Sequence, residues 1–438
     1  MLKHLSLKYV GPAERMQFEF APRLNVLTGD NGLGKTFILD IAWWVLTRTW
    51  AGQQAWPRPG RARETKITYS YEGRSGSASE IEANFDPKTE EWATRRGRPG
   101  MPGLVLYVRV DGGFSVWDPA RNYWRKRSSR DYDEPDRPDA FNFTPGEVWN
   151  GIEKSDGQWL CNGLLRDWVA WEDRNSREFG MLKAVLRGLS PGETEIIQPG
   201  SHTRVSVSDS RDIPTIELPY GTVPVTLASA GMRRILALAY LVVWAHTEHQ
   251  AAAKLIGDPP ADRFTVLVDE VEAHLHPQWQ RTILPALMEV IKGIDTRDTS
   301  DDAGAYANIQ VIATTHAPLV MASLEPIFDD TRDKVFNFDV VDRAVTVQKF
   351  EWRRMGDATA WLTNKDVFNL RSGRSIEAEN TIEEAASLMK NGHADAANVR
   401  KIHERLQRLL GDTDPFWIRW VYVAERKGWL DDTGTAEA

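Results

Sequence analysis

Cysteine is almost missing from this chain, because Cys161 is the single one among its 438 residues. An internal disulfide is therefore excluded, and the composition suits a reducing compartment. Long apolar runs are missing too: the best one is interrupted by His246 and is shorter than the roughly 20 residues of a membrane span. The start, Met1 to Ser6, alternates like a strand and does not resemble a signal peptide. We expect a cytoplasmic protein that does not enter a membrane.

Positive charge is not in excess, since 54 Lys and Arg face 62 Asp and Glu and the net charge is −8. This balance argues against a surface that is basic throughout, as a protein wrapped in nucleic acid would need. One basic segment with interleaved aromatics is Arg121-Asn122-Tyr123-Trp124-Arg125-Lys126-Arg127, with Arg95, Arg96 and Arg98 upstream. It could follow a phosphate backbone. It could equally be a solvated loop, because acids follow at once: Asp131, Asp133, Glu134 and Asp136.

The first of several short motifs is a glycine-rich loop between a predicted strand (23–28) and an apolar helix that begins at Phe37. Its residues are Gly29, Asp30, Asn31, Gly32, Leu33, Gly34, Lys35 and Thr36, which fit G-x-x-x-x-G-K-[ST]. The glycines allow successive backbone N–H groups to turn toward phosphates at the start of the helix. Lys35 should reach the β- and γ-phosphates, and the Thr36 hydroxyl should ligate Mg²⁺. A chance match is the alternative, but the strand–loop–helix context favours a site for ATP and Mg²⁺.

A second motif is the apolar strand Phe264 to Val268, which ends in two adjacent acids, Asp269 and Glu270. A buried parallel strand carries its functional residues at the C-terminal end. Asp269 is expected to hold the Mg²⁺ shell, and Glu270 to polarise the attacking water. The alternative is a pair of solvated acids that happen to follow a strand.

Between these two motifs, Ser229-Ala230-Gly231-Met232-Arg233 precedes a long apolar helix. Ser229 can cap this helix, and Gly231 leaves its first N–H groups bare. The positive end of the helix could therefore face a phosphate. An ordinary capped core helix is the alternative.

Two further motifs contain histidines. Glu272-Ala273-His274-Leu275-His276-Pro277 precedes a helix with an apolar stripe, Ile283, Leu284, Leu287 and Ile291. His274 and His276 beside acids would also allow a metal site. His316, within Thr314 to Pro318, follows the predicted strand Ile309 to Ala313 and could be purely structural.

In this order the motifs resemble the ATPase core of the ABC class, in its RecF-like and SMC-like form. The Glu-x-His-Leu-His-Pro segment is similar to the D-loop of overcoming-lysogenisation-defect and related defence ATPases, and the whole resembles stand-alone ATPase subunits of antiphage systems such as Septu. The resemblance covers about residues 1–350. It implies that two facing copies form two ATP sites, in a homodimer or larger homo-oligomer. Lys35, Glu270 and His316 would then be catalytic, with His316 sensing the γ-phosphate and Ser229 and Gly231 serving the opposite subunit.

The segment Ser229 to Arg233 takes the place of the family's signature motif but departs from its usual Leu-Ser-Gly-Gly. The sequence does not place the Q-loop glutamine securely, and Gln158 is the candidate. The predicted fold class is α/β, an ABC-type P-loop ATPase with a mixed sheet. Residues 1–150 form an N-terminal lobe with an antiparallel β subdomain that includes a hairpin (104–110 and 114–117). A helical insert (151–200, starting near Trp159 and Leu160), a C-terminal lobe (201–350) and a helical region (351–438) follow.

The stretch between Thr36 and Ser229 has no sustained heptads, which excludes long coiled-coil arms. The tail after His316 has no TOPRIM-like acids. Its aromatics, Phe416, Trp417 and Trp420, either pack on the ATPase core or form a docking face. We expect an ATPase that restrains or positions a separately encoded nuclease in antiphage defence. A RecF-like repair ATPase that clamps DNA is the runner-up, and an effector with its own site in the C-terminal region is a third possibility.

Overall fold

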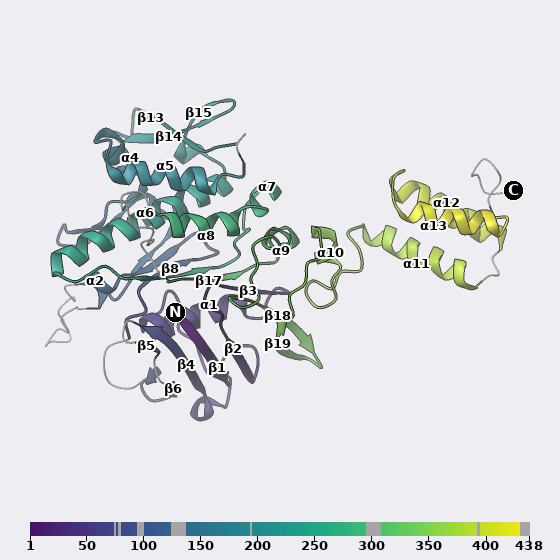
Figure 1. Cartoon of the computed structure of the whole chain (residues 1–438), viewed down its shortest axis with the longest axis horizontal. Helices are drawn as coiled ribbons and strands as arrows, with labels where there is room; N and C mark the ends of the chain where they lie inside the picture. The colour runs from purple at the N-terminus through teal and green to yellow at the C-terminus, as the bar shows by residue number, and fades with distance from the viewer. Residues whose placement is uncertain are drawn as a thin grey trace. The chain divides into compact units, whose positions relative to one another are not determined.

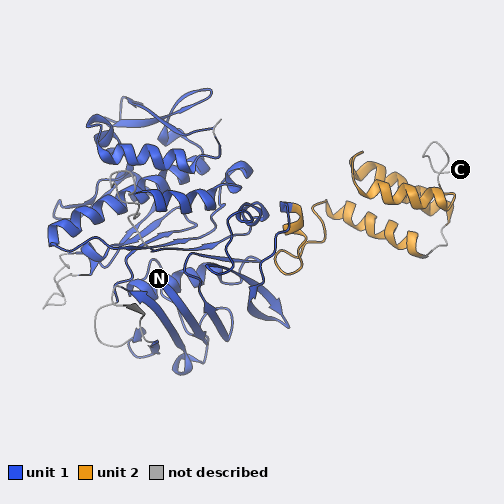
Figure 2. Cartoon of the chain, in the orientation of Figure 1, with its two compact units in different colours: residues 1–358 blue, residues 359–438 orange. Residues whose placement is uncertain are grey.

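The computed structural model of the chain describes residues 1–73, 76–77, 80–93, 100–123, 137–192, 195–294, 308–391 and 395–429. The chain divides into two compact units, Met1–Ala358 and Thr359–Ala438 (Figure 2). The first unit contains every nucleotide motif. Its layers of sheet and helix confirm the expected α/β fold class.

A mixed sheet of eight strands forms the centre of the first unit, in the order β10-β9-β8-β16-β17-β3-β18-β19. The five strands from β8 to β18 run parallel, and the outer ones are antiparallel. The carboxyl ends of parallel strands meet at one edge of a sheet. The loops that follow β3, β16 and β17 therefore lie together. The strands are β3 (Leu24–Gly29), β8 (Leu104–Val108), β9 (Phe114–Trp117), β10 (Phe141–Phe143), β16 (Arg263–Val268), β17 (Asn308–Thr314), β18 (Asp333–Val341) and β19 (Ala344–Phe350).

An antiparallel sheet, ordered β2-β1-β4-β6-β7 with β5 paired to β4, lies across helix α1 (Lys35–Thr47) from the central sheet (Figure 1). Alternate residues of β1, such as Leu5 and Leu7, are buried in one apolar core with α1 and with Leu267 and Ile312 of the central sheet. The strands are β1 (Leu2–Lys8), β2 (Arg15–Glu19), β4 (Lys66–Gly73), β5 (Gly76–Ser77), β6 (Ile81–Asp86) and β7 (Glu91–Ala93).

The predicted hairpin exists as β8 and β9, but its assignment to the antiparallel subdomain is wrong. β8 is buried along its whole length and pairs in parallel with β16, so it belongs to the central sheet. A continuous apolar run such as Leu104 to Val108 is typical of a strand covered on both faces.

Helices cover the other face of the central sheet (Figure 1). The longest, α6 (Ala230–Ile256), is capped by Ser229 and ends at Gly257 in a left-handed conformation. It packs against α5 (Arg177–Leu189), which also contacts α8 (Ile283–Gly293). The described residues contain no helix that combines the length and apolarity needed to cross a bilayer. The shorter helices are α2 (Pro119–Asn122), α3 (Pro145–Asn150), α4 (Leu164–Asp173), α7 (Pro277–Gln280), α9 (Pro318–Leu324), η1 (Ala62–Glu64) and η2 (Val225–Leu227).

The segment predicted as a helical insert begins with a hairpin, β11 (Ile152–Glu153) and β12 (Trp159–Cys161), before α4 and α5. Trp159 and Leu160 were assigned to a helix and lie in a strand instead. Gly157 explains the difference, because its positive φ of 82° suits the turn that joins β11 to β12. A three-stranded sheet of β13 (Gln198–Arg204), β14 (Asp212–Leu218) and β15 (Gly221–Pro224) follows α5.

The second unit contains three helices around a small core, α11 (Ile376–Asn391), α12 (Ala396–Leu409) and α13 (Phe416–Arg426); α10 (Ala358–Leu362) spans the boundary. Trp420 is fully buried there, and its indole donates to His403 Nδ1. Trp420 is therefore not part of a docking face. The exposed apolar residues of α13 are Ile418 (79% exposed) and Tyr422 (58% exposed).

Candidate nucleotide site

The glycine-rich loop joins β3 to α1 in a conformation that requires glycine. Gly29 has a φ of 126°, and a Cβ there would lie 2.1 Å from the Phe338 carbonyl oxygen. Gly34 has a φ of 94°, and a Cβ there would lie 2.5 Å from Pro12 Cγ. Both residues combine a left-handed backbone with a close neighbour, so no other amino acid fits without a shift.

The start of α1 is suited to an anion. No side chain caps Gly34, and the first turn carries no acid, so its N–H groups are left for a ligand. Asp30, Asn31 and Gly32 of the loop are exposed. Lys35 is buried, and its Nζ donates to the carbonyls of Gly29 (2.9 Å) and Asp30 (2.7 Å). Burial lowers the pKa of Lys35 to about 8, although the charges of Glu270 and Asp269 oppose the shift.

Thr36, Asp269 and Thr314 form a polar cluster behind the loop. Thr36 Oγ1 donates to Asp269 Oδ2 (2.9 Å), and Thr314 Oγ1 donates to Asp269 Oδ1 (2.8 Å). Asp269 is 1% exposed, and burial raises its pKa, which these two hydroxyls partly counteract. A hydroxyl and a buried carboxylate side by side are hard oxygen ligands, and a cation would relieve the desolvation of the acid. The predicted metal residues Thr36 and Asp269 thus fit Mg²⁺.

Glu270 and His316 lie next to each other at the same edge of the sheet. His316 Nε2 is 3.9 Å from Glu270 Oε1, and both side chains are partly exposed. The His316 amide donates to the carboxylate of Glu272, which fixes the residue from behind. Burial and the neighbouring charge of Lys35 lower the pKa of His316, which favours the uncharged form of its imidazole. The structure therefore brings together Lys35, Thr36, Asp269, Glu270 and His316, which come from three separate motifs.

The sequence alone did not assign a role to three residues that support the site. Thr314 bonds Asp269 and also accepts the Glu270 N–H (2.7 Å). Glu272 anchors His316, and Arg234 donates to the backbone carbonyls of Asp269 and Glu270. A signal existed for Thr314, because it ends a strand next to the Asp269 strand. Nothing in the sequence distinguishes Arg234 from other helical arginines.

The signature residues lie at the start of α6. The Ser229 side chain accepts from the Met232 amide (3.3 Å), and Ser229 itself is exposed. Gly231 faces the D-loop of the same chain, where a Cβ would lie 2.4 Å from the His274 carbonyl oxygen. His276 caps the short helix α7 through its ring nitrogen. Gln158 lies in the exposed turn before β12, where its backbone N–H donates to Asp156 Oδ1.

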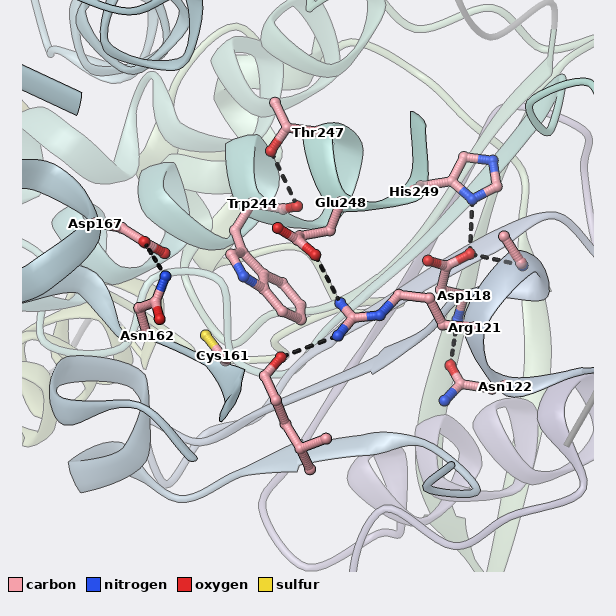
Figure 3. A network of polar contacts seen from close by, with 12 residues as sticks. Asp118, Arg121, Asn122, Cys161, Asn162, Asp167, Trp244, Thr247, Glu248 and His249 are labelled. Atoms are coloured by element: carbon pink, nitrogen blue, oxygen red, sulfur yellow. Dashed lines mark hydrogen bonds and ion pairs between the residues drawn. The ribbon is translucent and has the colours of Figure 1, made fainter. Parts of the chain in front are cut away.

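The Arg121 side chain, at the start of the basic segment, lies in an environment that differs from a nucleic-acid surface. The Arg121 guanidinium lies over the Phe141 ring, 4.1 Å from its centroid, and donates to the Leu160 carbonyl. It also pairs with Glu248 (Figure 3). Arg121 is therefore occupied inside the protein, where it joins α2 to α6 and β12. Arg95, Arg96, Arg98 and residues 124–127 lie outside the described residues.

Comparisons with known proteins find one family and several relatives. A family described as "AAA domain, putative AbiEii toxin, Type IV TA system" matches residues 24–322. The "Retron Ec83 probable ATPase" of Escherichia coli is 38% identical over 171 residues, which are 38% of this chain and 26% of that protein. The "Retron Vc95 probable ATPase" of Vibrio cholerae serotype O1 biovar El Tor is 37% identical over 59 residues, which are 14% of this chain and 9% of that protein.

Among solved structures, the "SMC head domain from Thermotoga maritima" covers 80% of this chain and 99% of its own, with 14% identity and a TM-score of 0.37. The "SmcHead bound to the C-winged helix domain of ScpA" covers 80% and 98%, with 15% identity and a TM-score of 0.39. These scores are too low to support a conclusion about function. The family match spans most of the chain and includes the loop, both acids and His316. The chain belongs to this AAA-domain family and is similar, over part of its length, to the two retron ATPases.

Proposed function

We propose that two copies of this chain close around Mg²⁺-ATP, hydrolyse it, and pass the resulting conformational change to a separately encoded effector. The observation that carries the proposal is the cluster at the carboxyl edge of the central sheet. There, Thr36 and Thr314 both bond the buried Asp269, and Glu270 lies beside His316. No simpler role accounts for a buried acid, a bare helix start and a buried lysine in one place.

Each residue has a defined task in this proposal. The N–H groups of residues 29–36 and the Lys35 ammonium hold the phosphates, and Thr36 and Asp269 hold the metal. The bound Mg²⁺ would neutralise charge on the phosphate oxygens. Glu270 takes a proton from the attacking water, and its carboxylate is partly exposed, as a base that meets water must be. The His316 imidazole, whose Nε2 lies 3.9 Å from Glu270 Oε1, can donate one hydrogen bond toward the γ-phosphate.

The second copy completes the site. Ser229 is exposed at the positive end of a long helix, and its cap satisfies the Met232 amide only. The first-turn amides that remain are suited to an anion. The exposure of Ser229 at this helix start leaves room for a ligand held by a second copy. We therefore assign Ser229 and the start of α6 to the nucleotide of the opposite subunit.

The proposed effector is a nuclease that acts with this chain in antiphage defence in the cytoplasm. Both relatives are named as ATPases of retrons, although the chain spans about a quarter of the first relative and about a tenth of the second. An ATPase without other chemistry needs a partner that reads its conformation. The exposed pair Ile418 and Tyr422 on α13 is our candidate for the docking surface.

Glu270→Gln tests the proposal. The amide keeps the shape of the side chain and cannot accept the proton, so ATP binding should persist while turnover is nearly abolished. Glu289→Gln, at an exposed position of α8, is the matched control and should behave as wild type. Wild-type turnover in Glu270→Gln would remove Glu270 from the role of base. Copurification of the natively expressed protein would identify the effector, and cleavage of DNA or RNA by the chain alone would contradict a separate nuclease.

The DNA-clamping alternative keeps one specific observation in its favour. Arg15, Lys8 and Lys66 lie directly opposite one another on β2, β1 and β4, on the face of the antiparallel sheet that points away from α1. Like charges directly opposite each other are destabilising, and strands are about 4.8 Å apart. Among the described residues no ion pair or hydrogen bond engages the Lys8 or Arg15 side chain. Such a row could contact a phosphate backbone.

Salt-dependent DNA binding tests this alternative. The double variant Lys8→Ala and Arg15→Ala should reduce the slope of log affinity against log salt by about two. The pair Lys254→Ala and Lys292→Ala removes the same charge from other elements and should leave the slope unchanged. No binding by the wild-type protein at low salt would exclude the alternative.

A further inference from the structure

Arg234 joins the start of α6 to the ends of two neighbouring strands. Its Nη1 donates to the carbonyl of Val110 (3.2 Å), which follows β8. Its Nη2 donates to the carbonyls of Asp269 (2.8 Å) and Glu270 (3.1 Å), which follow β16. One side chain on α6 therefore holds the backbone of both acids, Asp269 and Glu270.

The position requires the planar fork of arginine. Burial lowers the pKa of Arg234, and the charges of Asp269 and Glu270 oppose the shift. Nη1 donates to one neutral carbonyl and Nη2 to two others, so the two ends of the fork have separate acceptors. A lysine ammonium at the end of a flexible chain could reach one or two of them but not reproduce the fork.

The backbone of Glu270 is held on both sides in a conformation that a non-glycine residue rarely adopts. Its φ is 45°. The N–H donates to Thr314 Oγ1 (2.7 Å), and the carbonyl accepts from Arg234 and from the Ala273 amide (2.9 Å). A left-handed residue persists only where its surroundings fix it. The direction of the Glu270 carboxylate therefore depends on these contacts.

The first turn of α6 has a second contact with the segment that follows Glu270. A Cβ at Gly231 would lie 2.4 Å from the His274 carbonyl oxygen, so the helix and the D-loop touch through backbone atoms. His274 also has a positive φ, 63°. The helix that Ser229 caps thus abuts the catalytic segment at two points in the same chain.

We propose that Arg234 is a positioning residue for hydrolysis: from the signature helix, it fixes the backbone that aims the Glu270 carboxylate. It links the surface that meets the nucleotide of the second copy to the base that serves the nucleotide of its own chain. This inference rests on the proposed function, because it assumes ATP turnover in a dimer.

Substitution of Arg234 should separate turnover from binding. In Arg234→Ala and Arg234→Lys we expect kcat to fall by roughly 100-fold, the usual effect of misplacing a catalytic group by about 1 Å, with little change in the KM for ATP. Lys254→Ala removes a cation from the exposed far end of the same helix and should keep wild-type kcat. If Arg234→Ala does not fold, Arg234→Lys carries the test, because it keeps a cation in place.

Chemical rescue gives a readout that a structural role would not change. Arg234 lines a cavity of about 540 Å³ together with Val110, Trp149 and Ala230. A free guanidinium ion could therefore enter and replace the lost group. Millimolar guanidinium should restore part of the kcat of Arg234→Ala, and sodium chloride at the same ionic strength should not. Absence of rescue together with an equal loss of ATP binding would make Arg234 merely structural and overturn the inference.

Mixed dimers decide which glutamate Arg234 serves. A Lys35→Ala chain cannot hold ATP in its own phosphate loop, but its Ser229 and the start of α6 can still serve the partner's site. In a mixed dimer the partner therefore holds the one ATP that can be hydrolysed. Arg234→Ala in the chain that holds ATP should remove turnover, and in the Lys35→Ala chain it should have little effect. The reverse pattern would overturn the inference. A wild-type protein without turnover would overturn the proposed function itself, whereas normal turnover in Arg234→Ala would overturn this inference alone.

Discussion

Replacing Thr314 with valine would remove one hydroxyl that bonds both acids of the site. Thr314 Oγ1 donates to Asp269 Oδ1 (2.8 Å) and accepts from the Glu270 amide (2.7 Å), and the residue is fully buried. An unpaired buried amide costs about 1–3 kcal/mol, and a hydrogen bond to a charged group contributes about 1.5–3 kcal/mol. Because valine matches the shape of threonine, we expect the unfolding free energy to fall by roughly 2.5–6 kcal/mol from these two losses alone.

Urea unfolding of the purified protein measures this loss. Thr314→Ser is the matched control, because it keeps the hydroxyl and loses one methyl group, which costs about 1 kcal/mol. The kcat for ATP should fall in Thr314→Val, since Glu270 loses the bond that holds its N–H. Equal stability of the valine and serine variants, with turnover intact in both, would refute the role assigned to Thr314.

Three further predictions follow from burial and charge at named positions. Ser229→Asp and Ser229→Asn both keep an N-cap, but only the aspartate should block ATP-dependent association, because its charge repels the γ-phosphate. Mixing Ser229→Asp chains with Lys35→Ala chains should restore one working site per dimer. If the mixture shows no recovery, the composite site is contradicted. Gly231→Asp is a poorer choice, since any Cβ there meets the D-loop. Burial lowers the pKa of Lys35 from 10.5 to about 8, so the unfolded chain binds more protons between these values. The Lys35 contribution to the unfolding free energy should therefore rise with pH across that window, ATP affinity should fall, and Lys35→Met should remove the first trend. In the second unit, Trp420→Ala should lower the unfolding free energy by about 3–5 kcal/mol. Ile418→Glu should leave the unfolding free energy unchanged and weaken capture of the effector. If the effector is still captured by Ile418→Glu, this face of α13 is not the docking surface.

The strands and loops of the nucleotide site were predictable because their signals are local. A run of apolar residues that ends in Asp269 and Glu270 reads as a buried parallel strand, and β16 begins within a residue of the prediction. The glycines of the phosphate loop stand at positions where the backbone has a positive φ, as at Gly29 and Gly34. Parallel strands in one sheet then bring His316 to the same edge without further information.

The features that the sequence left open or placed wrongly depend on partners that lie far apart in the sequence. The hairpin of β8 and β9 was visible, but its neighbour β16 is more than a hundred residues away, and the sheet to which it belongs depends on that pairing. Arg121 sits among bases in the sequence and stacks on Phe141 and Trp244 in the fold. Trp420 reads equally well as an exposed or a buried aromatic until the neighbouring helices are placed.

The association state of Glu270→Gln with and without Mg²⁺-ATP tests the central claim most directly. Hydrolysis cannot dissolve the complex in this variant, so light scattering after size exclusion should show a monomer without nucleotide and a dimer, or a larger homo-oligomer, with it. Adding Ser229→Asp to the same chain should prevent the association while ATP still binds. A protein that binds ATP and stays monomeric, or that associates equally with Ser229→Asp, would contradict a site shared between two copies.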